Sequence, residues 1–168
     1  NVVVKKGANE DEILDLVERF SSRDIATRFI EYMDVGTTNG WAMEDVVTAD
    51  EIRSILSNLE PLPSQYHGEV AKRYRLPQGG EVGLITSVTE PFCGDCTRAR
   101  LSADGHLYTC LFASQGFDLL TPMREGATDE DLLALIESCW MARDDRYSEI
   151  RAEASPSHAR VEMSYIGG

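Results

Sequence analysis

The sequence has no long hydrophobic run and few basic residues. No apolar stretch approaches the roughly 18 to 20 residues of a membrane span, and no signal peptide opens the chain, so we expect neither a membrane partner nor secretion. Against 29 acidic residues stand only 16 lysines and arginines, which gives a formal net charge of −13. This balance argues against nucleic acid or anionic lipid as the main partner, although a local arginine cluster can still hold one phosphorylated small molecule.

Cysteine is also scarce, but its distribution is uneven. Three of the four cysteines fall in one stretch, as the pair Cys93-x-x-Cys96 and then Cys110 after thirteen further residues. A Cys-x-x-Cys pair places two thiols on one tight turn, close enough to bind a single metal centre. The spacing is that of metal ligands and not of a disulfide framework, which favours the reducing cytoplasm.

The stretch after the pair has the pattern of a β-hairpin. Residues 98–101 form one strand, residues 103–105 (Ala-Asp-Gly) the turn and residues 106–108 the return strand, which carries Cys110 back beside the pair. A two-residue Asp-Gly loop would place Cys110 opposite Ala99. We expect instead a three-residue loop with a left-handed glycine, which places Cys110 opposite Arg98.

Three thiols at this spacing are compatible with several centres. Zinc could use His106 or Cys139 as a fourth ligand, the pair could be a redox dithiol, or the three could hold an iron–sulfur cluster. His106 lies at the turn, several residues from Cys110, and Cys139 lies on a helical apolar stripe, where a buried structural thiol is expected. Without both, structural zinc lacks a ligand, whereas a four-iron cubane on three cysteines keeps one iron open for a substrate atom.

Arg98 and Arg100 share one strand face because side chains in a strand alternate. They can supply charge-assisted hydrogen bonds to an anionic or carbonyl-rich ligand. The alternative is a solvated strand face on which both arginines pair with carboxylates.

The first part of the chain has the pattern of a βαβ unit. Residues 1–6 form a β-branched strand, Asn9 with Glu12 forms a capping box for a helix, and residues 27–35 form a second strand. Parallel strands of this kind belong to covered, multi-stranded sheets. We therefore expect residues 1 to about 36 to complete a larger α/β sheet or barrel whose other strands precede this chain; a small standalone α+β domain is the alternative.

The rest of the chain alternates between helices and strands. Thr48 with Glu51 forms a second capping box, and Thr128 caps a last long helix. Between these helices, residues 69–76 and 82–88 form two strands around a Pro-Gln-Gly-Gly turn.

Seven segments of the sequence resemble the molybdenum cofactor biosynthesis protein A family. They are RFIEYMDVG (28–36), NGW (39–41), GEVAKRYR (68–75), GLITSVTEPFCGDCTRARLSADG (83–105), CLFA (110–113), RDDRYS (143–148) and SYIGG (164–168). The resemblance covers essentially the whole chain, which looks like the C-terminal half of such a protein. Members of that family are radical S-adenosylmethionine GTP 3′,8-cyclases.

The resemblance implies the fold class and the domains. It implies an α+β chain, with an α/β fragment at its start, in which residues 1–40 are the last βα units of an incomplete radical S-adenosylmethionine (β/α) barrel. Residues 41–168 are then a C-terminal domain with a small antiparallel sheet and flanking helices, which binds the second [4Fe-4S] cluster and the GTP base.

The resemblance also implies the residues of the site. Cys93, Cys96 and Cys110 match the three ligands of the second [4Fe-4S] cluster, and Arg98 and Arg100 match arginines that contact GTP.

Four further residues match positions of the family. Arg28, at the start of a barrel strand, matches an arginine of the GTP channel, and Met33, at the end of that strand, matches a residue that lines the S-adenosylmethionine site. Gly167 and Gly168 match a tail that reaches into the active site and is needed for the reaction.

One motif of the family has no counterpart in this sequence. The first [4Fe-4S] cluster, which cleaves S-adenosylmethionine, sits on a Cys-x3-Cys-x2-Cys loop, and no such loop occurs here. We therefore expect the chain alone to be inactive and to need the missing N-terminal barrel half, a reductant for the clusters, S-adenosylmethionine and GTP. The reaction implied for the parent enzyme converts GTP to 3′,8-cyclo-7,8-dihydro-GTP, and a homodimer is left open.

Two other functions compete with this interpretation. One is a zinc-stabilised interaction module without catalysis. The other is an auxiliary-cluster domain of a peptide-modifying radical enzyme, although such domains usually carry more than three cysteines.

Overall fold

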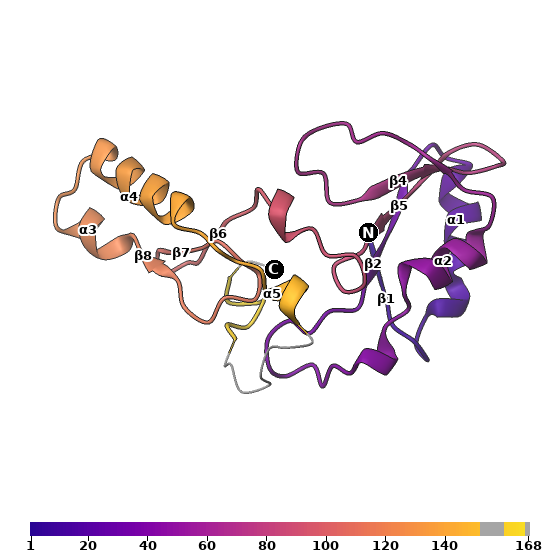
Figure 1. Ribbon diagram of the computed structural model, residues 1–168, viewed down its shortest axis with the longest axis horizontal. Coiled ribbons are helices and arrows are strands. Elements are labelled where there is room, and N and C mark those ends of the chain that lie inside the picture. Colours follow the sequence, from indigo (N-terminus) through magenta and orange to yellow (C-terminus); the bar gives the residue numbers. More distant parts are fainter. Residues whose placement is uncertain (152–159, 167–168) are drawn as a thin grey trace. The chain divides into compact units, whose positions relative to one another are not determined.

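The structure is a computed structural model, and it describes residues 1–151 and 160–166. Within that part of the chain, no helix is both long enough and apolar enough to cross a membrane. The chain divides into two compact units (Figure 1). The first comprises Asn1–Met33 and Trp41–Cys96, and the second comprises Asp34–Gly40 and the residues from Thr97 onwards.

The first unit is built on a mixed five-stranded sheet. Its strands lie in the order β1-β2-β5-β4-β3, of which β1, β2 and β5 run parallel while β4 and β3 are antiparallel to their neighbours. The strands are β1 (Val2–Val4), β2 (Thr27–Glu31), β3 (Glu60–Pro61), β4 (Lys72–Arg75) and β5 (Glu81–Ile85). The predicted parallel pairing of the first two strands around a helix is therefore confirmed.

One face of this sheet carries the hydrophobic core. Helices α1 (Ile13–Ser21) and α2 (Ala49–Leu56) pack on that face, and Figure 1 shows them side by side on one side of the sheet. The largest buried side chains of the core are those of Phe29, Ile13, Ile52 and Leu84, each at most 1% exposed. The apolar side chains on one face of each helix therefore pack against the apolar side chains that alternate along the strands.

The opposite face of the sheet is less covered. Val3 is 48% exposed, Arg28 is exposed, and the paired residues Ile30 and Ile85 are only half-buried. Several partly exposed apolar side chains on one sheet face are typical of a surface that packs against further protein structure.

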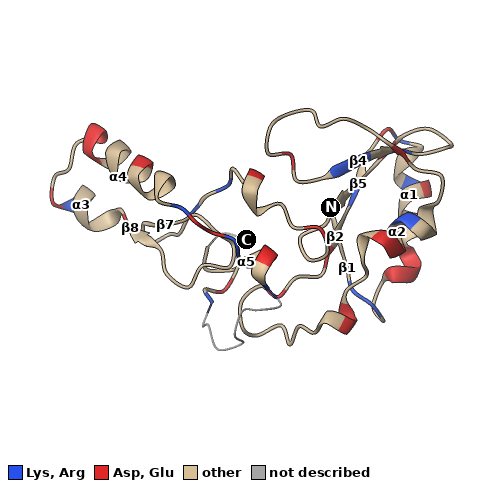
Figure 2. Ribbon diagram, viewed as in Figure 1, with Lys and Arg blue, Asp and Glu red and all other residues tan. Residues whose placement is uncertain are grey.

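The helix caps follow the sequence with one exception. Thr48 and Glu51 exchange the two hydrogen bonds of a capping box at α2. Thr128 and Asp131 do the same at α4 (Asp129–Met141), and Figure 2 shows the acidic first turns of both helices.

The capping box expected at Asn9 and Glu12 is wrong. Asn9 precedes a 3-10 turn, Glu10–Glu12, and its side chain makes no cap hydrogen bond. Instead it accepts a hydrogen bond from Lys5 N at 2.9 Å and donates one to Val3 O at 3.0 Å. The end of β1 therefore competes successfully with α1 for this side chain.

The second unit contains the small antiparallel sheet that the sequence predicts. Its strands are β6 (Arg100–Leu101), β7 (His106–Tyr108) and β8 (Phe117–Asp118), in that order. Three helices follow: α3 (Leu120–Arg124), α4 and α5 (Tyr147–Ile150). The apolar stripe of α4 is only partly covered, since Cys139 is buried while Leu135 and Ile136 are exposed.

The strand pairing extends the first sheet beyond residue 40. Strands β3, β4 and β5 pair into the same sheet as β1 and β2, so Trp41–Cys96 belongs with Asn1–Met33.

Candidate functional site

The Cys-x-x-Cys pair lies on one tight turn. Cys93–Asp95 forms a 3-10 turn, and Cys96 N donates to Cys93 O at 3.3 Å. Both cysteines are half-buried, and a Cβ at Gly94, which lies between them, would have no atom of the described residues within 4 Å apart from its chain neighbours. The turn therefore holds two thiols close in sequence at a partly accessible position.

The hairpin that follows has the predicted register. Arg100 pairs with Tyr108 and Leu101 with Leu107, and Ser102 N donates to His106 O at 3.0 Å. The loop is thus three residues long, and Gly105 is left-handed at φ +78°, as expected. Continued two positions beyond the last paired residues, this register sets Cys110 opposite Arg98.

The tip of the hairpin is fixed by Asp104. Its carboxylate accepts hydrogen bonds from Ser102 Oγ at 2.5 Å and from Tyr165 Oη. These bonds, that from Ser102 first, lower the pKa of Asp104, and the bond to Asp104 raises the pKa of Tyr165 to about 12. The contact joins the hairpin to the C-terminal segment.

The third cysteine follows the return strand of the hairpin. Cys110 is half-buried, and its Sγ accepts a hydrogen bond from Phe112 N at 3.4 Å. Backbone N–H donors to cysteine sulfur are among the interactions that tune protein-bound iron–sulfur centres. The residues present thus fit the ligands of such a cluster in kind: three cysteines, two on one turn and one with an N–H donor.

The structure brings two of the three thiols together within one unit. Cys93 and Cys96 belong to the first unit and Cys110 to the second. In residues 1–151 and 160–166, no three His, Cys, Asp or Glu side chains form a group that could hold a metal ion. The convergence of the three thiols stays a prediction.

The two alternative ligands have other surroundings. Cys139 is 6% exposed, and burial, with a smaller effect of Asp145, raises the pKa of its thiol. A raised pKa disfavours the thiolate that binds metal, and the burial confirms the expectation of a core thiol. His106 Nδ1 lies 3.1 Å from Asp104 Oδ2, at the turn.

The predicted substrate and cofactor residues lie on both units. Arg98 is exposed and Arg100 is half-buried in β6. Arg28 is exposed on β2, and the half-buried Met33 follows the end of that strand. The predicted Gly167 and Gly168 lie outside the described residues.

A buried charge cluster surrounds Asp34, the residue after Met33. Asp34 is 6% exposed and accepts hydrogen bonds from Tyr147 Oη at 2.6 Å, Arg151 Nε at 2.9 Å and Arg160 Nη1 at 2.9 Å. Burial first, and then the bond to Asp34, raises the pKa of Tyr147 to about 12. The cluster fixes the segment after β2 to α5 and to Arg160.

An aromatic ring completes this cluster. The Phe112 ring centroid lies 4.6 Å from that of Tyr147, and the Arg160 guanidinium carbon lies 4.4 Å from the Tyr147 centroid. Stacking of guanidinium on aromatic rings stabilises buried arginine. The segment that contains Cys110 and Phe112 is thereby held next to Asp34.

Sequence reasoning missed this cluster. Tyr147 begins α5, and Arg151, four residues later, is the cap that follows its last residue, so the two lie one helical turn apart on the same side. That spacing was the available signal, but nothing in it points to a carboxylate 113 residues earlier in the chain.

The same C-terminal segment is fixed at a second point. Glu162 Oε1 accepts hydrogen bonds from Thr37 N and Thr37 Oγ1, each at 2.8 Å. Val161 N donates to Ala113 O at 3.2 Å, and Ile166 is 1% exposed. Residues 160–166 are therefore packed in place up to the two terminal glycines.

A second buried carboxylate shapes the end of β2. Glu31 is 1% exposed and accepts backbone hydrogen bonds from Ala49 N at 3.0 Å, Val88 N at 2.7 Å and Thr89 N at 2.9 Å. It therefore joins β2 to the start of α2 and to the turn that leads from β5 toward the cysteine pair.

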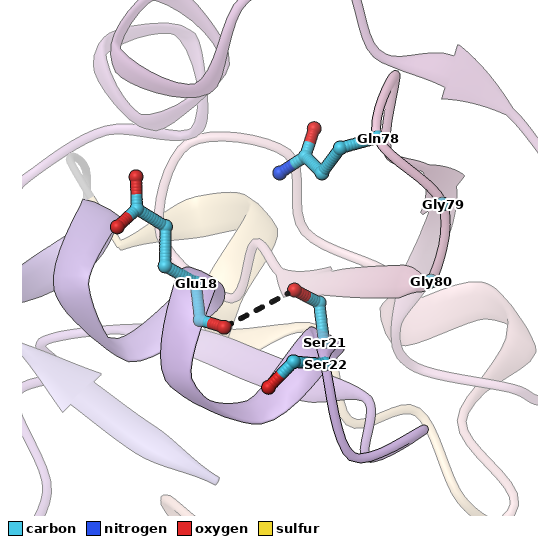
Figure 3. Close-up of a pocket in the computed structure, with 6 residues that line it drawn as sticks. All are labelled: Glu18, Ser21, Ser22, Gln78, Gly79 and Gly80. Atoms are coloured by element: carbon cyan, nitrogen blue, oxygen red, sulfur yellow. Dashed lines mark hydrogen bonds between the residues drawn. The ribbon is translucent and has the colours of Figure 1, made fainter.

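Figure 3 shows a hollow on the first unit, between the end of α1 and the turn before β5. Glu18, Ser21 and Ser22 line one side and Gln78, Gly79 and Gly80 the other. The two serine hydroxyls donate to carbonyls of their own helix. None of the predicted site residues lines this hollow, and it lacks a convergent set of charged groups.

Comparison with known proteins gives matches that cover the whole of this chain. GTP 3′,8-cyclase of Xanthomonas campestris pv. campestris strain B100 is 51% identical over an alignment of 172 positions, which covers 100% of this chain and 50% of the relative. The enzymes of the same name from Staphylococcus carnosus strain TM300 and Staphylococcus aureus strain Newman are 47% and 46% identical over 176 residues, with 100% of this chain and 52% of each relative covered. The chain spans about half the length of these relatives.

The family model described as Molybdenum Cofactor Synthesis C matches residues 25–149, which include the cysteine pair, the hairpin and α4. This match covers most of the chain, and the relatives agree with it. The chain therefore belongs to the Molybdenum Cofactor Synthesis C family.

Proposed function

We propose that this chain is the C-terminal part of a GTP 3′,8-cyclase, which converts GTP to 3′,8-cyclo-7,8-dihydro-GTP in molybdenum cofactor biosynthesis. The observation that carries the proposal is the 51% identity, over the whole chain, to an enzyme named for this reaction. At such identity the residues that bind substrate and cofactor are expected to be shared.

The first unit supplies the last strands of the incomplete barrel. Its parallel strands β1, β2 and β5 carry helices on one face, while the other face bears the partly exposed Val3, Ile30 and Ile85. Among the described residues no strand pairs with the outer edge of β1. An open parallel edge and a partly apolar face both need further chain, which in this account is the N-terminal barrel half.

Cys93, Cys96 and Cys110 bind the second [4Fe-4S] cluster in this account. Support comes from the turn that holds the first two and from the Phe112 N–H donor to the third. A cluster with three cysteine ligands supplies one iron with a position open to a nitrogen or oxygen atom of the guanine.

The arginines supply the charge that GTP needs. Arg98 and Arg100 hydrogen-bond the nucleotide beside the cysteines, and Arg28 contacts it from β2. Met33 lines the S-adenosylmethionine site, and Gly167 and Gly168, which match the functional tail of the family, contribute to the reaction.

The chemical task of these residues is to orient GTP. With S-adenosylmethionine and the first cluster present, the adenosyl radical would take the hydrogen from C3′ of the ribose and become 5′-deoxyadenosine. The C3′ radical would then join C8 of the guanine, and the nucleotide would take up one electron from the reductant and one proton at N7. A guanine held in one place keeps C8 near C3′, which is catalysis by proximity. The radical itself requires the Cys-x3-Cys-x2-Cys loop of the missing half and a reductant, so the chain alone is inactive.

The test combines activity and binding under anaerobic conditions. The full-length protein, with both clusters reconstituted, is expected to form the cyclised nucleotide from GTP, S-adenosylmethionine and a reductant, and this chain alone is expected to form none. A full-length protein that binds zinc tightly, stays colourless and leaves GTP unchanged would support the zinc module instead.

A further inference from the structure

Gly83 occupies the centre of the open sheet face. It lies in β5, where it pairs with Arg28 of β2 on one side and with Arg73 of β4 on the other. Residues paired in this way project from the same face of a sheet, so two arginines flank a position that has no side chain.

The space above Gly83 is filled by the stem of Arg28. A Cβ at residue 83 would lie 3.0 Å from Arg28 Cγ and 3.6 Å from its Cδ, and 3.2 Å from Ala71 Cβ. Gly83 is not among the described glycines with a positive φ, so its backbone does not require glycine. A glycine inside a strand marks a close approach, and here the approaching group is the Arg28 side chain.

The two arginines beside Gly83 differ in their partners. Arg73 donates from Nε and Nη2 to the Glu81 carboxylate, at 2.7 and 2.5 Å. Arg28 is an exposed residue, and none of the ion pairs among the described residues involves it. The Glu81 carboxylate is hydrogen-bonded to Arg73 and interacts with Arg28 only at longer range, so the Arg28 guanidinium has N–H donors left for an anion.

We propose that Gly83 is a positioning residue for GTP binding: its missing side chain lets the Arg28 stem lie across β5, which holds the guanidinium where it contacts the phosphates of the nucleotide. The proposal rests on the proposed function, because that function supplies GTP as the ligand of Arg28. A guanidinium is suited to phosphate oxygens, which it binds with two parallel N–H donors.

The test compares affinities in the full-length protein. Dissociation constants for GTP and for guanosine are measured for the unmodified protein, Arg28→Ala, Gly83→Ala and the double variant. Arg28→Ala is expected to weaken GTP about tenfold or more, the effect of a lost hydrogen bond to a charged group. Gly83→Ala is also expected to weaken the binding of GTP. Neither variant is expected to change the affinity for guanosine, which has no phosphate.

The double variant separates positioning from general damage. If Gly83 acts through Arg28, Gly83→Ala adds no further loss of GTP affinity, within about twofold, once Arg28 is alanine. Equal losses of GTP and guanosine affinity, or a full additional loss in the double variant, would overturn the proposal. If Gly83→Ala folds poorly, all variants are remade in a protein that also carries Ala71→Gly. That substitution removes the close contact between residue 71 and the new methyl group and leaves the contact with Arg28.

The outcomes also separate this proposal from the proposed function. Arg28→Ala with a large effect and Gly83→Ala with none overturns the role of Gly83 alone. Arg28→Ala without effect on GTP affinity overturns both the role of Gly83 and the assignment of Arg28 to the GTP site.

Discussion

Arg100 pairs with Tyr108 across the β6–β7 hairpin, and this register makes the connecting loop three residues long. Gly105, the last loop residue, is left-handed, and a Cβ there would lie 2.7 Å from Leu120 Cβ. Loop length, and with it the alignment of Cys110 with the strand that bears the arginines, therefore depends on one glycine.

Gly105→Ala is expected to destabilise the protein by about 2 to 3 kcal/mol, because it adds a clash to an unfavourable backbone conformation. Urea unfolding measures the loss. The matched control is Gly126→Ala, which has the same sign of φ (+97°) but, apart from its chain neighbours, no atom of the described residues within 4 Å of the added methyl group. Equal losses for the two variants would show that Leu120 contributes nothing.

Asp34→Asn is expected to cost about 3 to 5 kcal/mol of unfolding free energy. The substitution removes the carboxylate charge that lies between the guanidinium groups of Arg151 and Arg160, whose side chains are only 10% and 12% exposed. The exposed pair Arg146–Glu149 provides the control, and Glu149→Gln is expected to change stability by less than about 1 kcal/mol. A loss below about 1 kcal/mol for Asp34→Asn would contradict a stabilising role for the cluster.

The two tyrosines with raised pKa values predict a loss of stability at alkaline pH. Each pKa of about 12 in the folded protein exceeds the ordinary value of 10.0. The contribution is fully present below pH 10, and it is lost as the pH rises toward 12, because the unfolded chain gives up its protons first. Unfolding free energies at pH 9 to 12 are expected to fall more steeply for the unmodified protein than for Tyr147→Phe, and parallel curves would refute the assignment of Tyr147.

Arg98→Ala in the full-length protein is expected to weaken GTP binding by about 1.5 to 3 kcal/mol, the range for hydrogen bonds to charged groups. Equilibrium binding under anaerobic conditions measures it. Arg124→Ala, at an exposed position of α3, serves as the control for the loss of one positive charge. An unchanged dissociation constant for Arg98→Ala would remove this residue from the site.

Local signals in the sequence predicted the parts of the fold that local contacts determine. The capping boxes at Thr48 and Thr128 bring together residues three apart, and the hairpin at Gly105 is closed by residues four apart. In each case the side chain and its partner belong to the same turn of the chain, so the sequence pattern is enough to predict the contact.

Contacts between residues far apart in the sequence cannot be predicted from such local patterns. The strand pattern of β5 does not indicate that its neighbour is β2, so the sequence alone does not place β5 in the same sheet as β1 and β2. Asn9 had the pattern of a cap, but the nearby end of β1 takes its side chain. The partners of Asp34 lie 113 to 126 residues away, and no spacing rule connects them.

The central claim is that Cys93, Cys96 and Cys110 hold an iron–sulfur cluster, and iron content with absorption after anaerobic reconstitution of this chain tests it most directly. The account predicts a brown protein with about four irons per chain, loss of colour and iron in Cys93→Ala and Cys110→Ala, and retention of both in Cys139→Ala, whose thiol is buried in α4. A colourless protein that binds zinc, or loss of the cluster in Cys139→Ala but not in Cys110→Ala, would contradict it.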